Sequence, residues 1–351
     1  MAPPVAKTLI IRFSSVGDII LSSPLIRALR RRFPEAEIDF LVKSQYADLV
    51  RGNPHLTRVL EFPSGGSFGQ LRELRRRVRE TGYDLIVDIH GNLRSRYIAY
   101  GARRIARYRK HTLHRRALVH LKWNLFSETD RQTSVALRYL APLAPFGVTD
   151  DGLGLEVFPG EEDRARALTL LREAGLEGVT PLVAVAAGAR HWNKRWPAER
   201  FAHAAALIAQ KRGGAVLLLG AEDDGEVCRS VLDHLSRIAP ALRAANLAGR
   251  MSLRQAAALM DRCALVLTND SGLMHLAAAR KRPLVALFGP TVREFGFFPF
   301  GTESVVLEHA GLECRPCTTI GRADCPRSHF RCMLDTAPEA VARSAEQVLA
   351  A

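Results

Sequence analysis

The sequence predicts an α/β protein made of two consecutive doubly wound domains, each with a parallel sheet between helices. Three observations support this prediction. Short strand patterns alternate with helical patterns in the first half of the chain, a stretch rich in proline and glycine interrupts them at 142–160, and the alternation then starts again. Such alternation is typical of parallel strands joined by right-handed crossover helices.

In the first half, apolar runs predict strands and amphipathic stretches predict the helices between them. We expect strands at 7–13, 37–42, 57–61, 84–89 and, with a weaker pattern, 104–109. We expect helices at 18–32, 67–81, about 93–101 and about 114–126. The stretch PLAPFGVTDDGLGLEVFPG then interrupts the pattern, because proline and glycine mark turns and loops. A first domain is therefore expected at 1–150.

The second half repeats the pattern with more strongly apolar strands. These are PLVAVAAG (181–188), AVLLLG (215–220), ALVLTN (264–269) and PLVALFG (283–289). Helices are expected at 197–212, at 253–263 with Ser252 as the N-cap, and at 337–350. We expect a second domain at 160–336, followed by a C-terminal helix at 337–351 that could pack back on the first domain.

Composition limits the class of protein. With 351 residues and 47% apolar residues, the chain is long enough for two ordinary cores. No apolar run reaches the roughly 18–20 residues that span a bilayer. The stretch MAPPVAKTLIIRF lacks a signal-peptide pattern, because its apolar run is short and fits a strand. These observations predict a cytoplasmic protein.

The net charge of +14 is unevenly distributed. Residues 1–150 hold 26 Lys and Arg against 13 Asp and Glu, whereas the remainder holds 24 against 23. This excess predicts an anionic partner for the first half, namely nucleic acid, an anionic membrane face or a phosphorylated substrate; the plain alternative is a solvated arginine-rich surface. No nucleic acid is expected, because the basic clusters lack interleaved stacking aromatics and a known binding motif. The segment 103–122 alternates basic with apolar residues, which suits either peripheral contact with an anionic inner leaflet or closure of a substrate cleft.

Polar side chains follow the predicted strands at the edge where parallel sheets bind ligands, so we expect the two domains to face each other across a cleft. In the first domain these are Asp18, which could cap a helix or face a substrate, and the polar residues of DIHGNLRSR. In the second domain they lie in GARHWNKRWP, GAEDD and TNDSGLMHLAAA. The stretch NDSGLMH opens a helix whose free N–H groups could hold a phosphate, and a plain capped helix is the alternative.

Several absent motifs narrow the chemistry. The sequence has neither G-x-G-x-x-G nor G-x-x-x-x-G-K-[ST], which disfavours a dinucleotide oxidoreductase and a P-loop nucleotidase. It also has no D-x-D with which to hold a metal against a nucleotide diphosphate. Stabilisation of a diphosphate leaving group would then depend on Lys, Arg and a helix N-terminus.

Six stretches, in order, resemble one family. They are IIRFSSVGDIILSSPLIRALRRRFPEAEIDFLV, DLIVDIHGNLRS, KRWPAERFAHAAALI, LLLGAEDD, NLAGRMSLRQAAALMDRCALVLTNDSGLMHLAAARKRPLVALFGPT and the cysteine-bearing tail. Together they look like glycosyltransferase family 9, the ADP-heptose:lipopolysaccharide heptosyltransferase family. The resemblance implies a GT-B fold and an inverting, metal-independent transfer of heptose from ADP-heptose, with no further cofactor. It also implies an anionic lipopolysaccharide-precursor acceptor, with Kdo or heptose as the sugar that is extended.

The resemblance also assigns roles to residues. Asp18 matches the general base, and Lys194 matches the lysine at the donor phosphates, although the adjacent Arg195 could take that role. The other matches on the donor side are Glu222, Met251, Asp270, Ser271, Gly272 and His275. For the acceptor we expect His90, Asn92 and Arg94, together with the basic segment. The stretch AAGAR departs from the family pattern. The alternative is another nucleotide-sugar enzyme on the same fold, with a different donor or as a 2-epimerase.

Four of the six cysteines cluster near the C-terminus. Cys314, Cys317, Cys325 and Cys332 follow the spacing C-x2-C-x7-C-x6-C. The first pair is typical of a zinc site, but the second pair lacks that spacing. Reduced structural thiols, a structural metal or iron–sulfur site, and disulfide or redox chemistry are all compatible with the pattern. No catalytic metal is expected.

Overall fold

The computed structural model describes residues 5–350 and divides them into two compact units. Unit 1 comprises the chain up to His111 together with Ser134–Phe158, and unit 2 comprises Thr112–Thr133 and Pro159 onward. The boundary near residue 158 falls within the predicted stretch. The segment 112–133, expected in the first domain, belongs to unit 2 because its apolar side chains Leu118, Val119 and Phe126 pack against Phe295 there.

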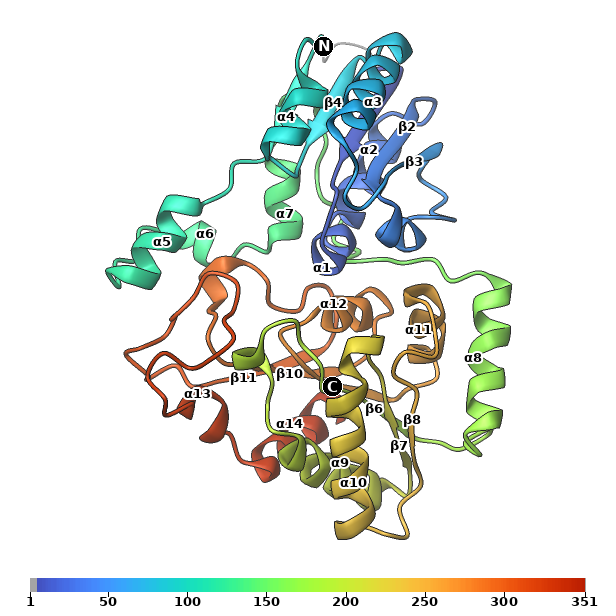
Figure 1. Ribbon diagram of the computed structural model, residues 1–351, viewed down its shortest axis with the longest axis vertical. Helices are drawn as coiled ribbons and strands as arrows, with labels where there is room; N and C mark the ends of the chain where they lie inside the picture. The colour runs from blue at the N-terminus through green and yellow to red at the C-terminus, as the bar shows by residue number, and fades with distance from the viewer. Residues whose placement is uncertain (1–4, 351) are drawn as a thin grey trace. The chain divides into compact units, whose positions relative to one another are not determined.

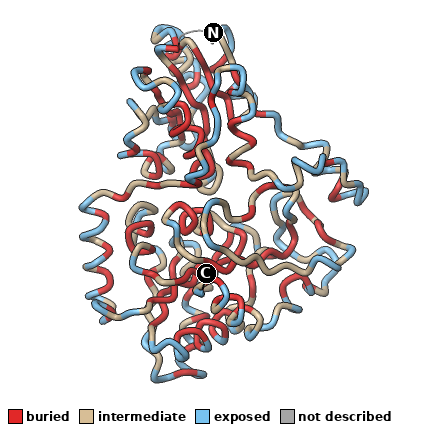
Figure 2. The backbone as a smooth tube through the Cα atoms, turned by 180° about the vertical axis from the view of Figure 1, so that it is seen from behind, coloured by how far each residue is buried: buried red, intermediate tan, exposed pale blue. Residues whose placement is uncertain are grey.

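Unit 1 contains a parallel five-stranded sheet in the order β3-β2-β1-β4-β5. Its strands are β1 (Lys7–Ile11), β2 (Glu37–Lys43), β3 (Arg58–Phe62), β4 (Leu85–Asp88) and β5 (Ile105–Arg107). Its helices are α1 (Val16–Ile20), α2 (Ser23–Arg32), α3 (Phe68–Thr81), α4 (Leu93–Ala99) and α7 (Val135–Leu140), with 3-10 turns at Ser44–Leu49 and Ala141–Phe146. All five predicted strands are therefore present. The central strands β2, β1 and β4 form the buried centre of the unit, shown in red in Figure 2, whereas the edge strands β3 and β5 are partly exposed.

The predicted helix at 18–32 is two helices, α1 and α2, rather than one. Pro24 lies in the first turn of α2, where its missing N–H costs nothing, but it cannot continue a helix from α1. The hydroxyls of Ser22 and Ser23 donate to the carbonyls of Ile19 and Ile20 at 2.6 and 2.7 Å. These bonds satisfy carbonyl groups that the break leaves without helical partners.

Unit 2 contains a parallel six-stranded sheet in the order β11-β10-β9-β6-β7-β8. Its strands are β6 (Leu182–Ala186), β7 (Ala215–Leu218), β8 (Ala244–Asn246), β9 (Leu265–Asn269), β10 (Leu284–Phe288) and β11 (Ser304–Glu308). Its helices are α5 (Thr112–His120), α6 (Glu128–Gln132), α8 (Glu161–Glu173), α9 (Ala198–Arg212), α10 (Gly225–Ile238), α11 (Leu253–Met260), α12 (Gly272–Ala279), α13 (Arg331–Leu334) and α14 (Pro338–Ala350). Short 3-10 turns lie at Trp192–Lys194, Glu222–Asp224 and Arg293–Phe295. Figure 1 shows α9, α10 and α14 together on one side of this sheet.

The last helix packs against the core of unit 2. Its buried face carries Val341, Ala345 and Val348, which join the core formed by α9 and the sheet. Arg212 of α9 also holds Glu346 through two hydrogen bonds of 3.1 and 3.0 Å. The apolar stripe of α14 therefore finds its partner on a neighbouring helix of the same unit.

A buried ion cluster fastens the end of the segment Ser134–Phe158 to α2. Arg27 donates to both carboxylate oxygens of Asp151 at 2.7 and 2.6 Å and to Glu156 at 2.6 Å. Arg31 approaches the same Asp151 at 3.0 Å but is 61% exposed, whereas the Arg27 side chain is only 6% exposed. Hydrogen bonds from Arg27 hold the pKa of Asp151 far below its usual value.

We expect Arg27→Lys to lower the free energy of unfolding by about 2 kcal/mol, because a lysine ammonium lacks the planar fork with which the guanidinium reaches both Asp151 and Glu156. Arg31→Lys is the matched control, and its exposed pair predicts a change of at most about 0.5 kcal/mol. Urea unfolding of both variants measures the difference. The pKa of Asp151 is lowered on folding. The ionised Asp151 therefore contributes to the free energy of unfolding above the ordinary Asp pKa, and this contribution is lost as the pH falls toward the pKa of the folded protein. Equal losses in the two variants would show that the buried contacts of Arg27 add no more stability than the exposed pair of Arg31.

Candidate functional site

Asp18 lies at the C-terminal edge of the unit 1 sheet, in the first turn of α1. Its Oδ1 atom accepts from Arg12 at 2.7 Å and from the Tyr139 hydroxyl at 3.1 Å. Its Oδ2 atom accepts from the hydroxyl and the backbone N–H of Ser15, at 2.9 and 3.3 Å. Asp18 is therefore a helix cap, as one of the two sequence interpretations requires. It is also part of a polar cluster assembled from three segments of the chain.

Electrostatics keep the Asp18 carboxylate ionised. Burial alone raises its pKa, but the charge of Arg12 and the hydrogen bonds from Ser15 outweigh burial, and the net pKa is lowered. Arg12 is itself fixed, since it donates to the carbonyl of Ile89 at 2.6 Å and lies 5.6 Å from the centre of the Tyr139 ring. The Asp18 side chain remains 18% exposed. An ionised and partly accessible carboxylate can accept a proton from a bound hydroxyl.

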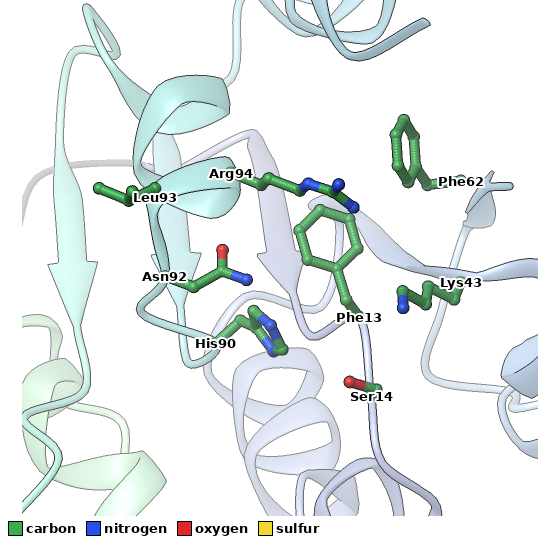
Figure 3. A pocket seen from close by; sticks show the side chains of 8 residues that line it. All are labelled: Phe13, Ser14, Lys43, Phe62, His90, Asn92, Leu93 and Arg94. Atoms are coloured by element: carbon green, nitrogen blue, oxygen red, sulfur yellow. The ribbon is translucent and has the colours of Figure 1, made fainter. Parts of the chain in front are cut away.

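A cavity of about 440 Å³ lies in unit 1 beside this cluster. Its lining consists of Phe13, Ser14, Lys43, Phe62, His90, Asn92, Leu93 and Arg94. Figure 3 shows the polar ends of Lys43, His90, Asn92 and Arg94 arranged around the ring of Phe13. The Phe13 ring lies 5.7 Å from Phe62 and makes an edge contact with His90 at 5.2 Å. An aromatic floor with a cationic and hydrogen-bonding rim suits a polar, negatively charged ligand.

The loop after β4 is built around the buried Asp88. Its carboxylate accepts from the backbone N–H groups of His90 and Gly91, at 3.1 and 2.8 Å, and from the Ser95 hydroxyl at 3.0 Å. Asn92 caps α4 by accepting from the Ser95 N–H at 2.8 Å. These bonds fix the positions of His90 and Asn92 at the cavity.

His90 is a neutral group in this site. Burial, followed by the charges of Arg12 and Lys110, lowers its pKa to about 3. The imidazole therefore offers hydrogen bonds and no charge at neutral pH. The positive charge on the lining of the cavity comes from Lys43 and Arg94.

In unit 2, the pairing of Lys194 with Asp270 is the central contact at the strand ends. The Lys194 ammonium lies 2.6 Å from Asp270, and the two side chains are only 13% and 9% exposed. The same Asp270 oxygen accepts from the Thr291 hydroxyl at 2.7 Å. Asn269 accepts from the Trp196 N–H at 3.0 Å and donates to the Ala187 carbonyl at 2.7 Å. The loops after β6, β9 and β10 are thus held together.

The helix α12 begins directly after Asp270. Ser271 occupies its N-cap in an extended conformation, and the Ser271 hydroxyl lies 3.4 Å from that of Thr268. Gly272 starts the helix, and His275 is buried in its first turn. The first N–H groups of a helix have no acceptor within the helix and attract anions.

Glu222 and Met251 lie on neighbouring loops, after β7 and β8. Gly249 has φ +74°, and a Cβ atom there would lie 3.2 Å from the Cα of Glu222. Its N–H donates to the carbonyl of Gly220 at 3.0 Å. The glycine therefore allows the loop that carries Met251 to approach Glu222 closely. Arg195 is directed elsewhere, since its Nε atom donates to the Ala189 carbonyl at 2.7 Å.

The four clustered cysteines are free thiols. Cys314 lies 3.7 Å from the His329 imidazole, and Cys325 accepts from the Phe330 N–H at 3.4 Å. Burial, with Cys317 and other nearby thiols, raises the pKa of Cys332 to about 12. Within residues 5–350 no group of three or more His, Cys, Asp or Glu side chains is arranged to hold a metal ion.

Several contributors to these clusters were not identified from the sequence, among them Arg12, Lys43, Tyr139 and Thr291. Lys43 is the last residue of β2, and Arg12 directly follows β1. Their positions at strand ends could have identified both as candidate site residues. Thr291 also follows a strand, β10. Tyr139 has no such signal, because it comes from α7, 121 residues from Asp18.

Comparisons with known proteins agree over nearly the whole chain. The family model described as glycosyltransferase family 9 (heptosyltransferase) matches residues 71–324. Lipooligosaccharide heptosyltransferase 2 of Haemophilus influenzae is 29% identical, with 97% of this chain and 99% of that protein covered. Lipopolysaccharide heptosyltransferase 2 of Salmonella typhimurium is 28% identical, with 98% of each chain covered.

Solved structures show the same fold. A glycosyl transferase family 9 protein from Veillonella parvula superposes with a TM-score of 0.82 at 25% identity, covering 100% of this chain and 99% of that chain. The ADP-heptose lps heptosyltransferase II of E. coli gives a TM-score of 0.71 at 24% identity and 98% coverage of both chains. The expected α/β architecture of the GT-B class, with two Rossmann-like sheets, is confirmed.

Proposed function

The chain belongs to glycosyltransferase family 9 and is a glycosyltransferase, and from this premise we propose that it transfers heptose from ADP-heptose to the inner core of lipopolysaccharide. The family description and the names of the full-length relatives support the sugar and the class of acceptor. The observation that carries the proposal is an ionised Asp18 beside a cavity that offers Lys43 and Arg94 to an acidic acceptor.

Asp18 acts as the general base in this proposal. As the acceptor oxygen bonds to the anomeric carbon, the acceptor O–H proton passes to Asp18. The bond between that carbon and the ADP oxygen breaks, and its electron pair leaves with ADP. Attack from the face opposite ADP inverts the anomeric configuration. His90, Asn92 and Arg94 bind the acceptor in this scheme, because they line the cavity with their polar ends toward it.

The donor is assigned to unit 2. Lys194 carries a fixed positive charge beside the N-terminus of α12, where Ser271, Gly272 and His275 begin the helix. These groups would stabilise the diphosphate leaving group without a metal ion. Asp270 is assigned to the sugar, and Glu222 and Met251 to the adenosine, because their loops meet at Gly249. The acceptor is anchored by lipid A, so we place the reaction at the cytoplasmic face of the inner membrane.

The test measures ADP release from ADP-heptose by the purified protein in EDTA. Two soluble acceptors are compared, deacylated Kdo-lipid A and the same molecule carrying one heptose, and UDP- and GDP-sugars serve as donor controls. We expect release that depends on one of the two acceptors and survives EDTA, with an anomeric configuration opposite to that of the donor by NMR. Absence of release with both acceptors would contradict the proposed substrates. Release with a control donor in place of ADP-heptose would favour a different sugar.

A further inference from the structure

The segment that follows α5 alternates between residues fixed to unit 2 and residues directed to solvent. Lys122 donates to the carbonyls of Cys314 and Pro316 at 3.0 and 2.8 Å. Asn124 donates to Glu294 at 3.0 Å, and Phe126 is buried in the apolar cluster around Phe295. Three anchors within five residues hold this short segment in place against unit 2.

The residues that alternate with these anchors are large, apolar and exposed. Leu121, Trp123 and Leu125 are 54%, 61% and 55% exposed. On α5 itself, Leu118 and Val119 face the core, whereas Leu113 is 76% exposed. Figure 2 shows an exposed tube over much of this region. Fixed apolar side chains grouped in this way mark an interaction surface, since burying them in an apolar environment is favourable. We call Leu113, Leu121, Trp123 and Leu125 the apolar edge.

Basic residues predominate along the chain at the apolar edge. From Arg109 to Ser127 the chain contains five Lys and Arg residues and no Asp or Glu, whereas Glu128 and Asp130 follow in α6 and Glu294 contacts Asn124. Arg116 lies on the exposed side of α5, one turn from Leu113, and Arg109 and Lys110 directly precede the helix in the chain. Basic residues with tryptophan and leucine suit the headgroup region of an anionic bilayer, where the cations meet phosphate and the apolar groups enter the boundary of the acyl chains.

We propose that the apolar edge and Arg116 bind the surface of an anionic lipid bilayer. The contact is peripheral, because within residues 5–350 no helix has the length and hydropathy to cross a membrane. The proposed function places the reaction at the inner membrane, and the apolar edge is the surface that would bind that membrane. This inference rests on the proposed function only in that the acceptor is anchored in lipid. Lipid binding itself requires no turnover.

The test is flotation of the full-length protein with vesicles of phosphatidylethanolamine and phosphatidylglycerol, compared with phosphatidylcholine vesicles. We expect binding to the anionic vesicles, a loss of ~10-fold or more in W123S/L125S, and a loss of about fivefold in R116Q. L207S is the matched control, since Leu207 is 43% exposed on α9 of the same unit, and it should bind as the wild type does. Thermal unfolding establishes that the variants are folded.

ADP release with the soluble deacylated acceptor separates this proposal from the proposed function. The assay should be unchanged in W123S/L125S, because neither Trp123 nor Leu125 is among the residues of the two candidate clusters. Three results would overturn the proposal: no vesicle binding by the wild type, equal binding to neutral vesicles, or wild-type binding by W123S/L125S. A fourth is a wild-type oligomer that becomes monomeric in W123S/L125S, which would show that a second copy covers this surface.

Discussion

Asp18→Asn should lower the rate of ADP release by ~10²–10⁴-fold, the usual contribution of a positioned general base. Asparagine keeps an oxygen that can accept from Arg12 and Tyr139, which hold Asp18 at 2.7 and 3.1 Å. It cannot take up the acceptor proton at neutral pH. The variant therefore removes the chemistry while preserving most of the local contacts. Single-turnover measurements with saturating donor and acceptor report the change in the chemical step.

Ser15→Ala is the matched control for this experiment. It removes the 2.9 Å hydrogen bond to the other Asp18 oxygen but leaves the carboxylate in place. Its rate at neutral pH should stay within about tenfold of the wild type, because one hydrogen bond to a charged group contributes about 1.5 kcal/mol or somewhat more. Full activity of Asp18→Asn would reduce Asp18 to a helix cap and would remove the mechanism proposed above.

The pH dependence has a definite sign. The pKa of Asp18 is lowered in the folded protein, so its protonation lies below the ordinary Asp value of about 3.9. Between pH 5 and 8 the wild-type rate should therefore show no loss from protonation of Asp18. Ser15→Ala weakens the stabilisation of the carboxylate, so the pKa of Asp18 should rise. The loss of rate on the acidic side should then begin at a higher pH in Ser15→Ala than in the wild type.

Much of the fold was accessible from the sequence because buried parallel strands are apolar on both faces. The run TLIIRF gave β1, and ALVLTN gave β9. Pro24 is a signal for a helix break in the sequence. The apolar periodicity of the surrounding residues nevertheless predicted one continuous helix over 18–32. The strands β8 and β11 were missed, because their residues are only partly buried and lack a strong apolar run.

The candidate site was less accessible, because side-chain partners far apart in the chain create it. Asp18 and Asp270, which the sequence places after strands, each lie in a polar cluster. The partner Tyr139 comes from a short helix that no periodicity marked. The segment 112–133 was assigned to the first domain by chain order, whereas burial of Phe126 against Phe295 decides its place. Such long-range packing is not encoded in local pattern.

Lys194→Gln should lower kcat/KM for ADP-heptose by ~10²–10³-fold, because it removes a fixed charge from the departing diphosphate. Without ligand, Lys194 is paired with Asp270 at 2.6 Å, so phosphate binding must compete with that carboxylate. Asp270→Asn removes the competitor. We therefore expect Asp270→Asn to bind ADP at least as tightly as the wild type in calorimetry, although its turnover of ADP-heptose falls. Lys194→Gln should weaken ADP binding.

Arg195→Gln provides the control for Lys194→Gln, since both variants remove one adjacent positive charge. The Arg195 side chain is held by the Ala189 carbonyl at 2.7 Å, whereas Lys194 stands beside the N-terminus of α12. The loss of ADP affinity should therefore be smaller for Arg195→Gln than for Lys194→Gln. A larger loss for Arg195→Gln would assign the diphosphate to Arg195 and leave Lys194 as a structural partner of Asp270. Tighter ADP binding in Asp270→Asn, with weaker binding in Lys194→Gln, is the combination that competition between Asp270 and the diphosphate for the Lys194 ammonium predicts.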